Sequence, residues 1–410
     1  MKKAILIIIA LMLVLTVTTS CNRGDGTVTL HMWLWDDVQL PAMRAMADAF
    51  IEQHPHITVE TTVFPGIGDF NIKMQSVFGT PDVPEVFWMG MNLAVEMMPL
   101  GIIQDLTTFI NNEPTIDLGR LNPYMVDFFT LNGRVFGIPK DLDTFAVFFN
   151  KDLFEAAGEP FPSNNWTFQE FADTARRMTS PGVFGWANST SDRVMYSFIL
   201  ANGGQIYSAD GMSAVVNSPA SVEAMQLVMD LMNEGVAPGH IELAEINTNM
   251  SFISGRSAML IEGSWMISQF YEAFGDRLGI VEFPIGRAGR GSTSHSIAFA
   301  TSVGNRHMEE TLKFLAWLSQ DEALVKQAGV TIPSSLVAAN AWADVHPNIN
   351  TQAFVSAFTY SPPTPLAARN AARVRSVAQE YFGNMRAGLY ANAQEAMNAM
   401  ANALDFAIRN

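Results

Sequence analysis

Apolar and polar residues alternate along residues 28–35, a spacing of two that predicts a β-strand, and residues 57–64, rich in Val and Thr, predict a second strand. Between the two, apolar residues recur at helical spacing from Met43 to Ile51. A strand, a helix and a strand in this order indicate a parallel sheet. The pattern continues with a helix over 70–78, a strand over 86–88 and a helix over 93–100 that ends at Gly101.

The second half of the chain contains clear helix starts. Thr167 and Glu170 have the spacing of a capping box, and Trp166 and Phe171 that of a hydrophobic staple. We therefore assign Trp166 to structure and not to a site. Further helices begin at Ser218-Pro219, cover 308–318 and, as two or three packed helices, fill about the last fifty residues after Pro362-Pro363-x-Pro365.

The first residues have the layout of a secretion signal. Lys2 and Lys3 precede an apolar run over 4–15, which is shorter than the roughly 20 residues that a transmembrane helix needs. Small polar residues and the only cysteine, Cys21, follow, an order that resembles a bacterial lipoprotein signal, in which the thiol receives lipid. We expect a signal peptide over 1–20, a lipid on Cys21 and a tether over 21–26. The alternatives are a soluble secreted protein or an uncleaved anchor, and each of these places the globular part outside the cytoplasmic membrane.

The composition limits the class of partner. Without the signal peptide, 390 of the 410 residues remain, enough for two domains. The signal holds two of the 24 basic residues, so 22 remain against 40 acidic ones and the net charge becomes −18. A chain this acidic does not suit nucleic acid or anionic lipid, and it disfavours an anionic ligand unless a local basic pocket overrides the net charge.

The chain lacks the usual catalytic motifs. It has no G-x-S-x-G, H-E-x-x-H, P-loop or C-x-x-C sequence, so we expect no cofactor and no enzyme. His54 and His56 are two apart on a predicted strand without a third ligand nearby, so we expect no metal site. Asp141 and Asp143 share one face of an extended segment, as the two carboxylates of a glycosidase could, although surface acids explain the pair more simply.

Tryptophans stand at the ends of the predicted strands. Trp33 and Trp35 end the first strand on one face and Trp88 ends the third, where an open parallel sheet binds its ligands. An indole stacks on the apolar face of a sugar, and polar side chains meet its hydroxyl groups. Polar residues after these strands are Asp36, Asp37 and Asn92. They indicate a carbohydrate site; alternatively, the indoles are ordinary core residues. Because Trp33 and Trp35 share a face, one location should explain both.

Five sequence blocks in a fixed order resemble one protein family. They are residues 79–110, residues 133–158 with Phe149 where the family usually has Tyr, the helix start at Trp166-Thr167, residues 252–265, and Phe283-Pro284-x-Gly286 followed by the helix that ends in Phe314-Leu315. On these blocks the chain resembles the extracellular solute-binding proteins of ABC importers, in the sugar-binding group that includes maltodextrin-binding protein.

The resemblance implies an α/β fold of two lobes, each a sheet flanked by helices, joined by a hinge of crossing segments and ending in a helical C-terminal segment. This is the type II periplasmic-binding-protein fold, with the ligand in the cleft between the lobes. Chain order assigns residues 27–140 and 286–338 to the first lobe and residues 141–285 and 339–410 to the second.

The motif positions of the family also imply site residues. Trp88 matches a stacking indole of the first lobe, Trp265 one of the second, and Asp143 an acid on the crossing strand that binds hydroxyl groups. Asp36 or Asp37 lies where the family often places another such acid. At the loop of Met91 and Asn92 some maltodextrin binders have charged residues, and this departure leaves the sugar open. Candidates chosen from loop position are Trp35, Asp69, Trp186, Asn188 and Arg193.

We therefore expect a lipid-tethered, monomeric sugar-binding component of an ABC importer, which closes around its sugar and docks on the transmembrane subunits of a permease. The alternative keeps the fold with a polyamine, an iron complex, glycerol phosphate or a peptide as ligand. Few Arg or Lys residues stand near the candidate loops, which disfavours an anion, whereas a cation could use Asp36, Asp37, Asp141 and Asp143. An anchored glycosidase and a structural role are further alternatives.

Overall fold

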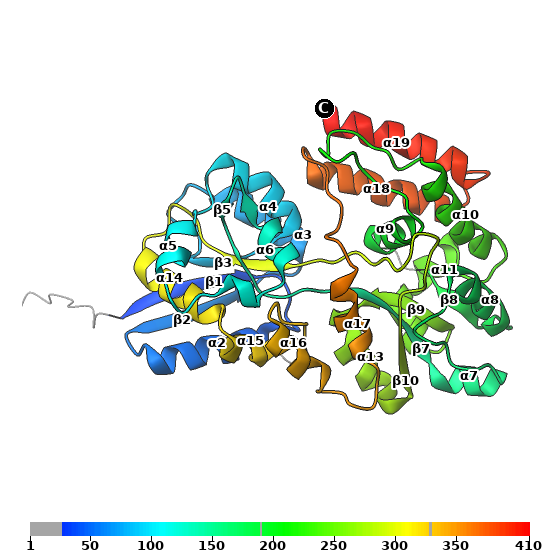
Figure 1. The fold of residues 1–410 in the computed structure, drawn as a ribbon, viewed down its shortest axis with the longest axis horizontal. Helices are drawn as coiled ribbons and strands as arrows, with labels where there is room; N and C mark the ends of the chain where they lie inside the picture. The colour runs from blue at the N-terminus through cyan, green and yellow to red at the C-terminus, as the bar shows by residue number, and fades with distance from the viewer. Residues whose placement is uncertain (1–26, 189–190, 328–329) are drawn as a thin grey trace, which may run out of the picture.

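The computed structural model describes residues 27–188, 191–327 and 330–410. The predicted signal peptide and tether, including Cys21, lie outside the described residues. Within them the chain forms two α/β lobes that lie side by side along the long axis of the molecule (Figure 1). Both lobes combine a sheet with packed helices, as the sequence predicted.

The first lobe is built on a five-stranded sheet. β1 runs parallel to β2 and β3, as the strand–helix–strand pattern predicted, while β11 pairs with β3 in the antiparallel direction. Every residue of β3 is buried, as expected for a central strand with helices on both faces. The strands in order across the sheet are β2 (Ile57–Val63), β1 (Val28–Leu34), β3 (Val86–Gly90), β11 (Ile297–Ala300) and β6 (Ile138–Pro139).

Helices around this sheet include those predicted from the apolar periodicity. In α2 the side chains of Met43, Met46 and Phe50 are buried on one stripe against the sheet. The helices are α2 (Leu40–Gln53), α3 (Ile67–Val77), α4 (Met91–Met97), α5 (Thr107–Asn112), α6 (Pro123–Phe128), α14 (Met308–Leu318), α15 (Asp321–Leu324) and α16 (Leu336–Ala343), with a hairpin of β4 (Thr130–Leu131) and β5 (Arg134–Val135).

The second lobe contains a four-stranded mixed sheet. β7 is antiparallel to both of its neighbours, and β8 lies parallel to β9 at the edge. The strands in order are β10 (Leu278–Glu282), β7 (Phe145–Asn150), β9 (Ser257–Gly263) and β8 (Phe184–Ala187). The helices are α7 (Lys151–Ala157), α8 (Phe168–Met178), α9 (Asp192–Ala201), α10 (Pro219–Asn233), α11 (His240–Glu245), α12 (Thr248–Ile253), α13 (Ile267–Phe274), α17 (Gln352–Ser356), α18 (Ala371–Arg386) and α19 (Ala393–Arg409).

The predicted start of α8 is confirmed in detail. The side chain of Thr167 accepts a hydrogen bond from the Glu170 amide, and the Glu170 carboxylate accepts one from the Thr167 amide. Trp166 packs edge-on against Phe171 at 5.5 Å, and its indole N–H donates to the carbonyl of Glu282 at 2.9 Å. Trp166 is therefore structural, as the staple predicted.

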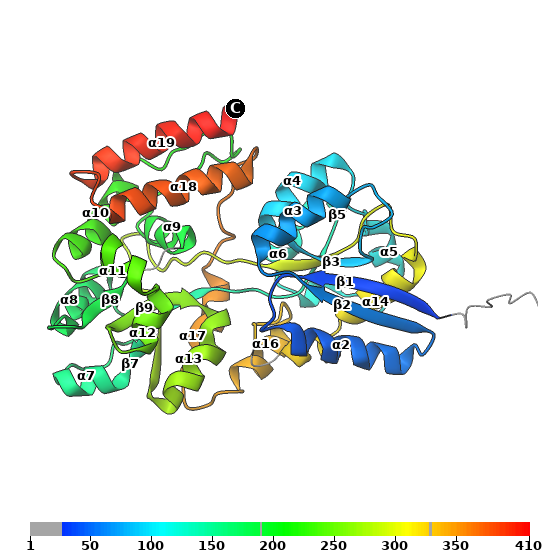
Figure 2. The same ribbon diagram turned by 180° about the vertical axis from the view of Figure 1, so that it is seen from behind.

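The C-terminal segment is helical, as predicted, and belongs to the second lobe. α18 and α19 pack on each other over α9 and α10 at the top of the molecule (Figure 2). Val374, Phe382 and Met397 contribute their side chains to the core of this lobe. The two helices thus bring residues from the end of the chain back toward the middle of the molecule.

Extended segments connect the lobes and pair with one another. Asp141 bridges to Pro333, Asp143 to His295, and Ser294 to Pro363. Residues 286–293, which we expected in the first lobe, instead lie against the second: Gly286 and Gly291 sit on Ala201 so closely that a Cβ would meet its atoms at 2.6 Å. The second segment that crosses between the lobes therefore lies about ten residues later than predicted, near 294–297.

The described helices and the His54–His56 pair bear on two further questions, a membrane-spanning helix and a metal site. Across the described ranges, no helix is both long and apolar enough to span a membrane. His54 ends α2 and His56 precedes β2, so the prediction that both lie on a strand is wrong. In the part of the chain that the structure describes, no three His, Cys, Asp or Glu side chains group as metal ligands would.

Candidate functional site

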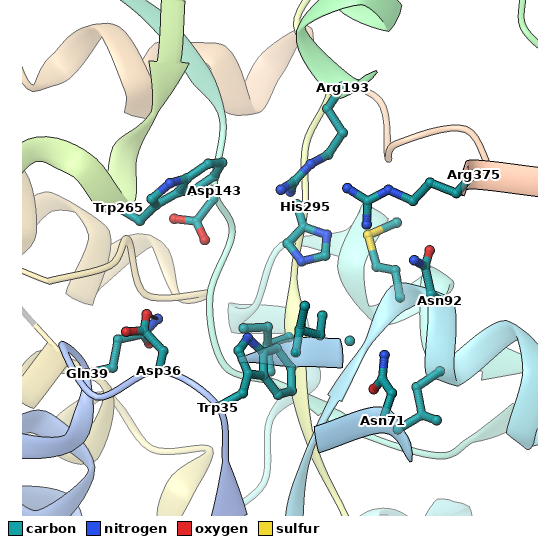
Figure 3. Close-up of a pocket in the computed structure, with 15 residues that line it drawn as sticks. Trp35, Asp36, Gln39, Asn71, Asn92, Asp143, Arg193, Trp265, His295 and Arg375 are labelled. Carbon is teal, nitrogen blue, oxygen red and sulfur yellow. Dashed lines mark hydrogen bonds between the residues drawn. The ribbon is translucent and has the colours of Figure 1, made fainter. Parts of the chain in front are cut away.

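A pocket of about 830 Å³, part of it open to solvent, lies between the lobes (Figure 3). The ends of β1 and β3 supply Trp35, Asp36, Met91 and Asn92, as expected for ligand sites at the carboxyl ends of parallel strands. The other lobe and the crossing segments close it. The lining residues are Trp35, Asp36, Gln39, Ile67, Asn71, Gly90, Met91, Asn92, Leu93, Asp143, Arg193, Trp265, His295, Ile297 and Arg375.

Trp35 forms part of the floor of this pocket and rests on a second indole. Its ring contacts Trp88 edge-on at 5.1 Å and Phe70 at 4.8 Å. Trp88 has 0% of its surface exposed, and the Lys140 ammonium lies 4.7 Å from its ring centre. Trp88, which we expected to stack on the ligand, therefore does not line the pocket, because Trp35 covers it.

Trp33 and Trp35 do not share one location in the pocket. Trp33 packs on Phe64 at 5.1 Å, and Phe64 in turn contacts Phe70 at 5.7 Å. The two indoles thus flank one aromatic cluster, but only Trp35 of the pair lines the pocket. Trp33, which we expected to contact the ligand, is a half-buried packing residue outside the pocket lining.

Four other candidates also lie away from the pocket. Trp186 is fully buried in the second lobe against Phe171, at 5.4 Å, because β8 points it into the core. Asn188 is buried, and its amide lies 2.9 Å from the sulfur of Met232. Asp37 and Asp69 are exposed and outside the lining.

Asp36 is held by a chain of hydrogen bonds that leads into the hinge. Its carboxylate accepts from the Val38 amide at 3.0 Å and from the Gln39 side chain at 2.8 Å. The Gln39 carbonyl oxygen accepts from Lys140 at 2.7 Å, and Lys140 also donates to Asp141 at 2.5 Å. Lys140 and Asp141 are fully buried, so these hydrogen bonds fix the position of the Asp36 carboxylate from the protein interior.

Asp141 and Asp143 do not act as a pair at the pocket. Asp141 accepts from the Ile297 amide at 2.8 Å and from Lys140, and it does not line the pocket. Asp143 does line it, and accepts a hydrogen bond of 2.6 Å from Ser264. Burial, reinforced by the nearby Asp141, raises the pKa of Asp143 to about 7.

Trp265 brings an aromatic face from the second lobe. It follows β9 in a short 3₁₀ turn, and its ring contacts Phe145 edge-on at 5.4 Å. The indole folds back over Gly263, where a Cβ would lie 2.1 Å from the ring, so a residue with a side chain would displace it. Beside it, burial raises the pKa of Glu262 to about 7.

Two guanidinium groups enter the pocket from the second lobe. The guanidinium carbon of Arg193 lies 5.1 Å from the Trp265 ring centre, at cation–π distance. Arg375, from α18, donates to both carboxylate oxygens of Asp192 at 3.0 Å. The expectation that few basic residues lie near the site is therefore wrong. Burial and both arginines lower the pKa of His295 well below its usual value, so this imidazole is neutral at pH 7.

The sequence did not reveal Gln39, Asn71, His295 and Arg375 as lining residues. Arg375 lies in a C-terminal helix, and only the packing of α18 on α9 carries it to the pocket. A signal for His295 did exist: it stands in Ser292-Thr293-Ser294-His295-Ser296, a polar run whose serines and threonine are buried at the hinge.

Residues 45–352 match the family model of bacterial extracellular solute-binding proteins. The chain belongs to this family. A putative binding protein of Brucella abortus (strain 2308) is 25% identical over 295 residues, covering 69% of each chain. A lactose-binding protein of Rhizobium radiobacter is 25% identical over 252 residues, covering 59% of this chain and 57% of the relative.

The fold also matches solved structures. An ABC substrate-binding protein from Listeria monocytogenes, solved in complex with cycloalternan, superposes with a TM-score of 0.85 at 21% identity, over 93% of this chain and 99% of the other. The family member described here therefore has the two-lobed architecture of known substrate-binding proteins. Its family places it outside the cytoplasm, and its relatives are binding proteins.

Proposed function

We propose that this protein captures a sugar or oligosaccharide in the pocket between its lobes and delivers it to the membrane subunits of an ABC importer. The lactose-binding protein among its relatives and the cycloalternan complex among similar structures support this ligand class. The single observation that carries the proposal is the meeting of Trp35 and Trp265, from opposite lobes, at one pocket with the carboxylates of Asp36 and Asp143.

This arrangement suits a carbohydrate. Each indole offers an apolar face for the C–H side of a sugar ring, and the carboxylates and Asn92 offer acceptors and donors to its hydroxyl groups. Because the two indoles belong to different lobes, a sugar that contacts both binds the closed arrangement more tightly than an open one. That difference in affinity is what drives closure.

Secretion and anchoring complete the proposal. The signal peptide would direct the chain across the membrane, and a lipid on Cys21 would hold it at the outer side as a monomeric lipoprotein near its permease. A single acyl chain gives only marginal membrane binding, so stable anchoring requires more than one chain. The closed form would dock on the transmembrane subunits with surfaces of both lobes.

The alternatives fit the pocket less well. A polyamine would lie beside Arg193 and Arg375, whose charges repel it. A glycosidase that uses Asp141 and Asp143 would need both at the pocket, whereas Asp141 is buried with Lys140. An iron complex, glycerol phosphate or a peptide remains as a competing ligand in the test.

The test is a titration of the purified mature chain with a panel of sugars, followed by tryptophan fluorescence and calorimetry. We expect saturable binding of a saccharide and none of putrescine, glycerol phosphate or peptides. Trp265→Ala should weaken binding roughly 10- to 100-fold, as truncation of a central buried aromatic contact does. Trp33→Phe, outside the pocket, is the matched control. Saturable binding of a non-sugar ligand, or no response to any saccharide, would overturn the proposal.

A further inference from the structure

The pocket is electrically divided. In Figure 3 the carboxylates of Asp36 and Asp143 lie toward one side, and the guanidinium groups of Arg193 and Arg375 lie toward the other. The net charge of the chain is strongly negative, so two arginines at one pocket are a local exception to it. The hydrogen-bond and ion-pair partners of each arginine indicate whether its charge is balanced within the protein or by a ligand.

Arg375 is already neutralised within the protein. Its Nε and Nη2 donate to the two oxygens of Asp192 at 3.0 Å, and Asp192 is 1% exposed. Gln379 donates to the same carboxylate at 3.2 Å. This two-pronged pair ties α18 to the start of α9, and it accounts for the charge of Arg375 without a ligand.

Arg193 lacks such a partner. Its Nε and Nη1 are buried, and neither has a hydrogen-bond acceptor among the described residues. Over the same residues no carboxylate oxygen lies within 4.0 Å of its guanidinium. The three carboxylates whose charges act on Arg193 are bonded elsewhere: Asp192 accepts from Arg375, Glu262 from the Gly263 amide, and Asp143 from Ser264.

An unpaired buried cation is costly, and proteins keep one mainly where a partner binds. Burial and the charge of Arg375 both lower the pKa of Arg193, because both disfavour its charged form. The side chain stands at the pocket and next to the Trp265 ring, so a group bound over that indole lies within reach of the guanidinium.

We propose that the bound saccharide is acidic, with the carboxylate of a uronic acid residue paired to Arg193 while its ring stacks on Trp265. This inference rests on the proposed function. A carboxylate offers two oxygens in one plane, which matches the guanidinium fork. Its single negative charge balances one guanidinium, and Asp192 has already balanced the other, so a doubly charged phosphate is the poorer match.

The experiment compares oligosaccharides that differ only in charge. Oligogalacturonates, glucuronoxylan fragments and alginate oligosaccharides are each paired with the same compound after methyl esterification or reduction of the carboxylate. Thermal shift selects the members that bind, and calorimetry measures their affinities. We expect at least one acidic compound to bind roughly 10- to 100-fold more tightly than its neutral counterpart, and the advantage to shrink as salt is added.

Arg193→Gln should remove most of that advantage, so that the acidic compound and its neutral counterpart bind the variant with similar affinity. The unliganded variant should melt no lower than the wild type, because an unpaired buried charge is gone. Arg287→Gln, an exposed arginine paired with Glu223 away from the pocket, is the matched control. Equal binding of acidic and neutral compounds, or tight binding of neutral ones alone, would overturn this inference and leave the sugar-binding proposal standing. Failure of every saccharide would overturn both.

Discussion

The carboxylate of Glu96 accepts a hydrogen bond of 3.1 Å from the backbone amide of Ala372 across the gap between the lobes. Glu96 lies in α4 of the first lobe, and Ala372 lies in the first turn of α18 in the second. The residue before that helix, Asn370, provides no side-chain cap. The Glu96 carboxylate therefore caps the N-terminus of α18 from the opposite lobe, and a negative charge is favourable at that end of a helix.

Because this contact joins the lobes only when they are close, we predict that Glu96 stabilises the closed state. Glu96→Ala should weaken ligand binding by roughly 2- to 30-fold, the range expected from losing one cap. Calorimetry would measure the affinity. Small-angle scattering of the unliganded and liganded variant would measure the opening of the lobes.

Glu52→Ala on α2 of the same lobe is the control, because Glu52 is exposed and far along the sequence from the contact. An affinity and a radius of gyration that match the wild type in Glu96→Ala would show that the contact contributes nothing to closure. A loss of stability without a change in either would assign Glu96 to the folding of α4 instead.

The buried Lys140 supports the pocket through Gln39 and Asp36, and we predict that its removal affects stability and affinity together. Lys140→Met leaves the carboxyl group of Asp141 buried without its partner, which should cost about 3–5 kcal/mol in the free energy of unfolding. Denaturant unfolding would measure this cost.

The double variant Lys140→Met, Asp141→Asn should regain most of that stability, because the unpaired carboxyl is gone. It should still bind ligand more weakly than the wild type, since Gln39 loses the donor that orients it toward Asp36. Wild-type affinity in the double variant would mean that the hydrogen-bond chain does not position Asp36.

The sequence predicted individual helices and strands well because their signals are local, whereas the two-lobed arrangement was implied by the family resemblance. Strand alternation in β1, the stripe of α2 and the capping box of α8 each depend on neighbours a few residues apart. The same periodicity could not say which indole of a strand end faces solvent. Trp88 and Trp35 differ in role only because Trp35, which follows β1, lies over Trp88 of β3.

The candidate site was predicted in part for the same reason. Trp35, Asp36, Asn92, Asp143, Arg193 and Trp265 stand near strand ends or on motifs, and the structure places them at the pocket. Arg375 could not be found from the sequence, because its position depends on how α18 packs on α9. Its partner, Asp192, lies 183 residues earlier in the chain. The late crossing near 294–297 likewise follows from the packing of Gly286 and Gly291 on α9.

Buried carboxyl groups should make the unliganded protein less stable as pH rises. The pKa of Asp143 is raised from 3.8 to about 7, so the native state holds this proton more tightly than the unfolded chain. The resulting stability is complete below about pH 4 and is lost as pH rises through about 7. Asp143→Asn should therefore raise the melting temperature relative to the wild type at pH 8 but not at pH 4.

Thermal melts between pH 4 and pH 8 would measure this difference. Asp48→Asn, at an exposed position of α2, changes the net charge equally and should have no such pH-dependent effect. If both variants shift the melting temperature by the same amount at every pH, the overall negative charge of the chain explains the trend and the burial of Asp143 does not.

Lipid attachment at Cys21 is tested by fractionation of cells that make the full chain. We predict that the wild-type protein sediments with the membranes and that Cys21→Ser is released in soluble form, because the only thiol in the chain is gone. Mass spectrometry of the wild type should show an acylated N-terminal cysteine. Soluble wild-type protein that begins at another residue would contradict the anchor and leave the secretion signal possible.

The two stacked indoles of the first lobe should separate stability from binding. Trp88→Ala should cost roughly 3–5 kcal/mol in the free energy of unfolding, because it leaves a cavity beneath Trp35. Trp35→Ala should lower the free energy of unfolding less than Trp88→Ala does, and it should weaken ligand binding more, because the Trp35 side chain is half-buried and lines the pocket. Trp88→Phe keeps most of the packing and removes an indole N–H that has no acceptor among the described residues, so it should keep both properties near the wild type. Denaturant unfolding and calorimetry on the same preparations give the two quantities separately. If Trp88→Phe folds normally but loses the sugar, then Trp88 contacts the ligand after Trp35 moves aside, and the order of the two indoles must change on binding.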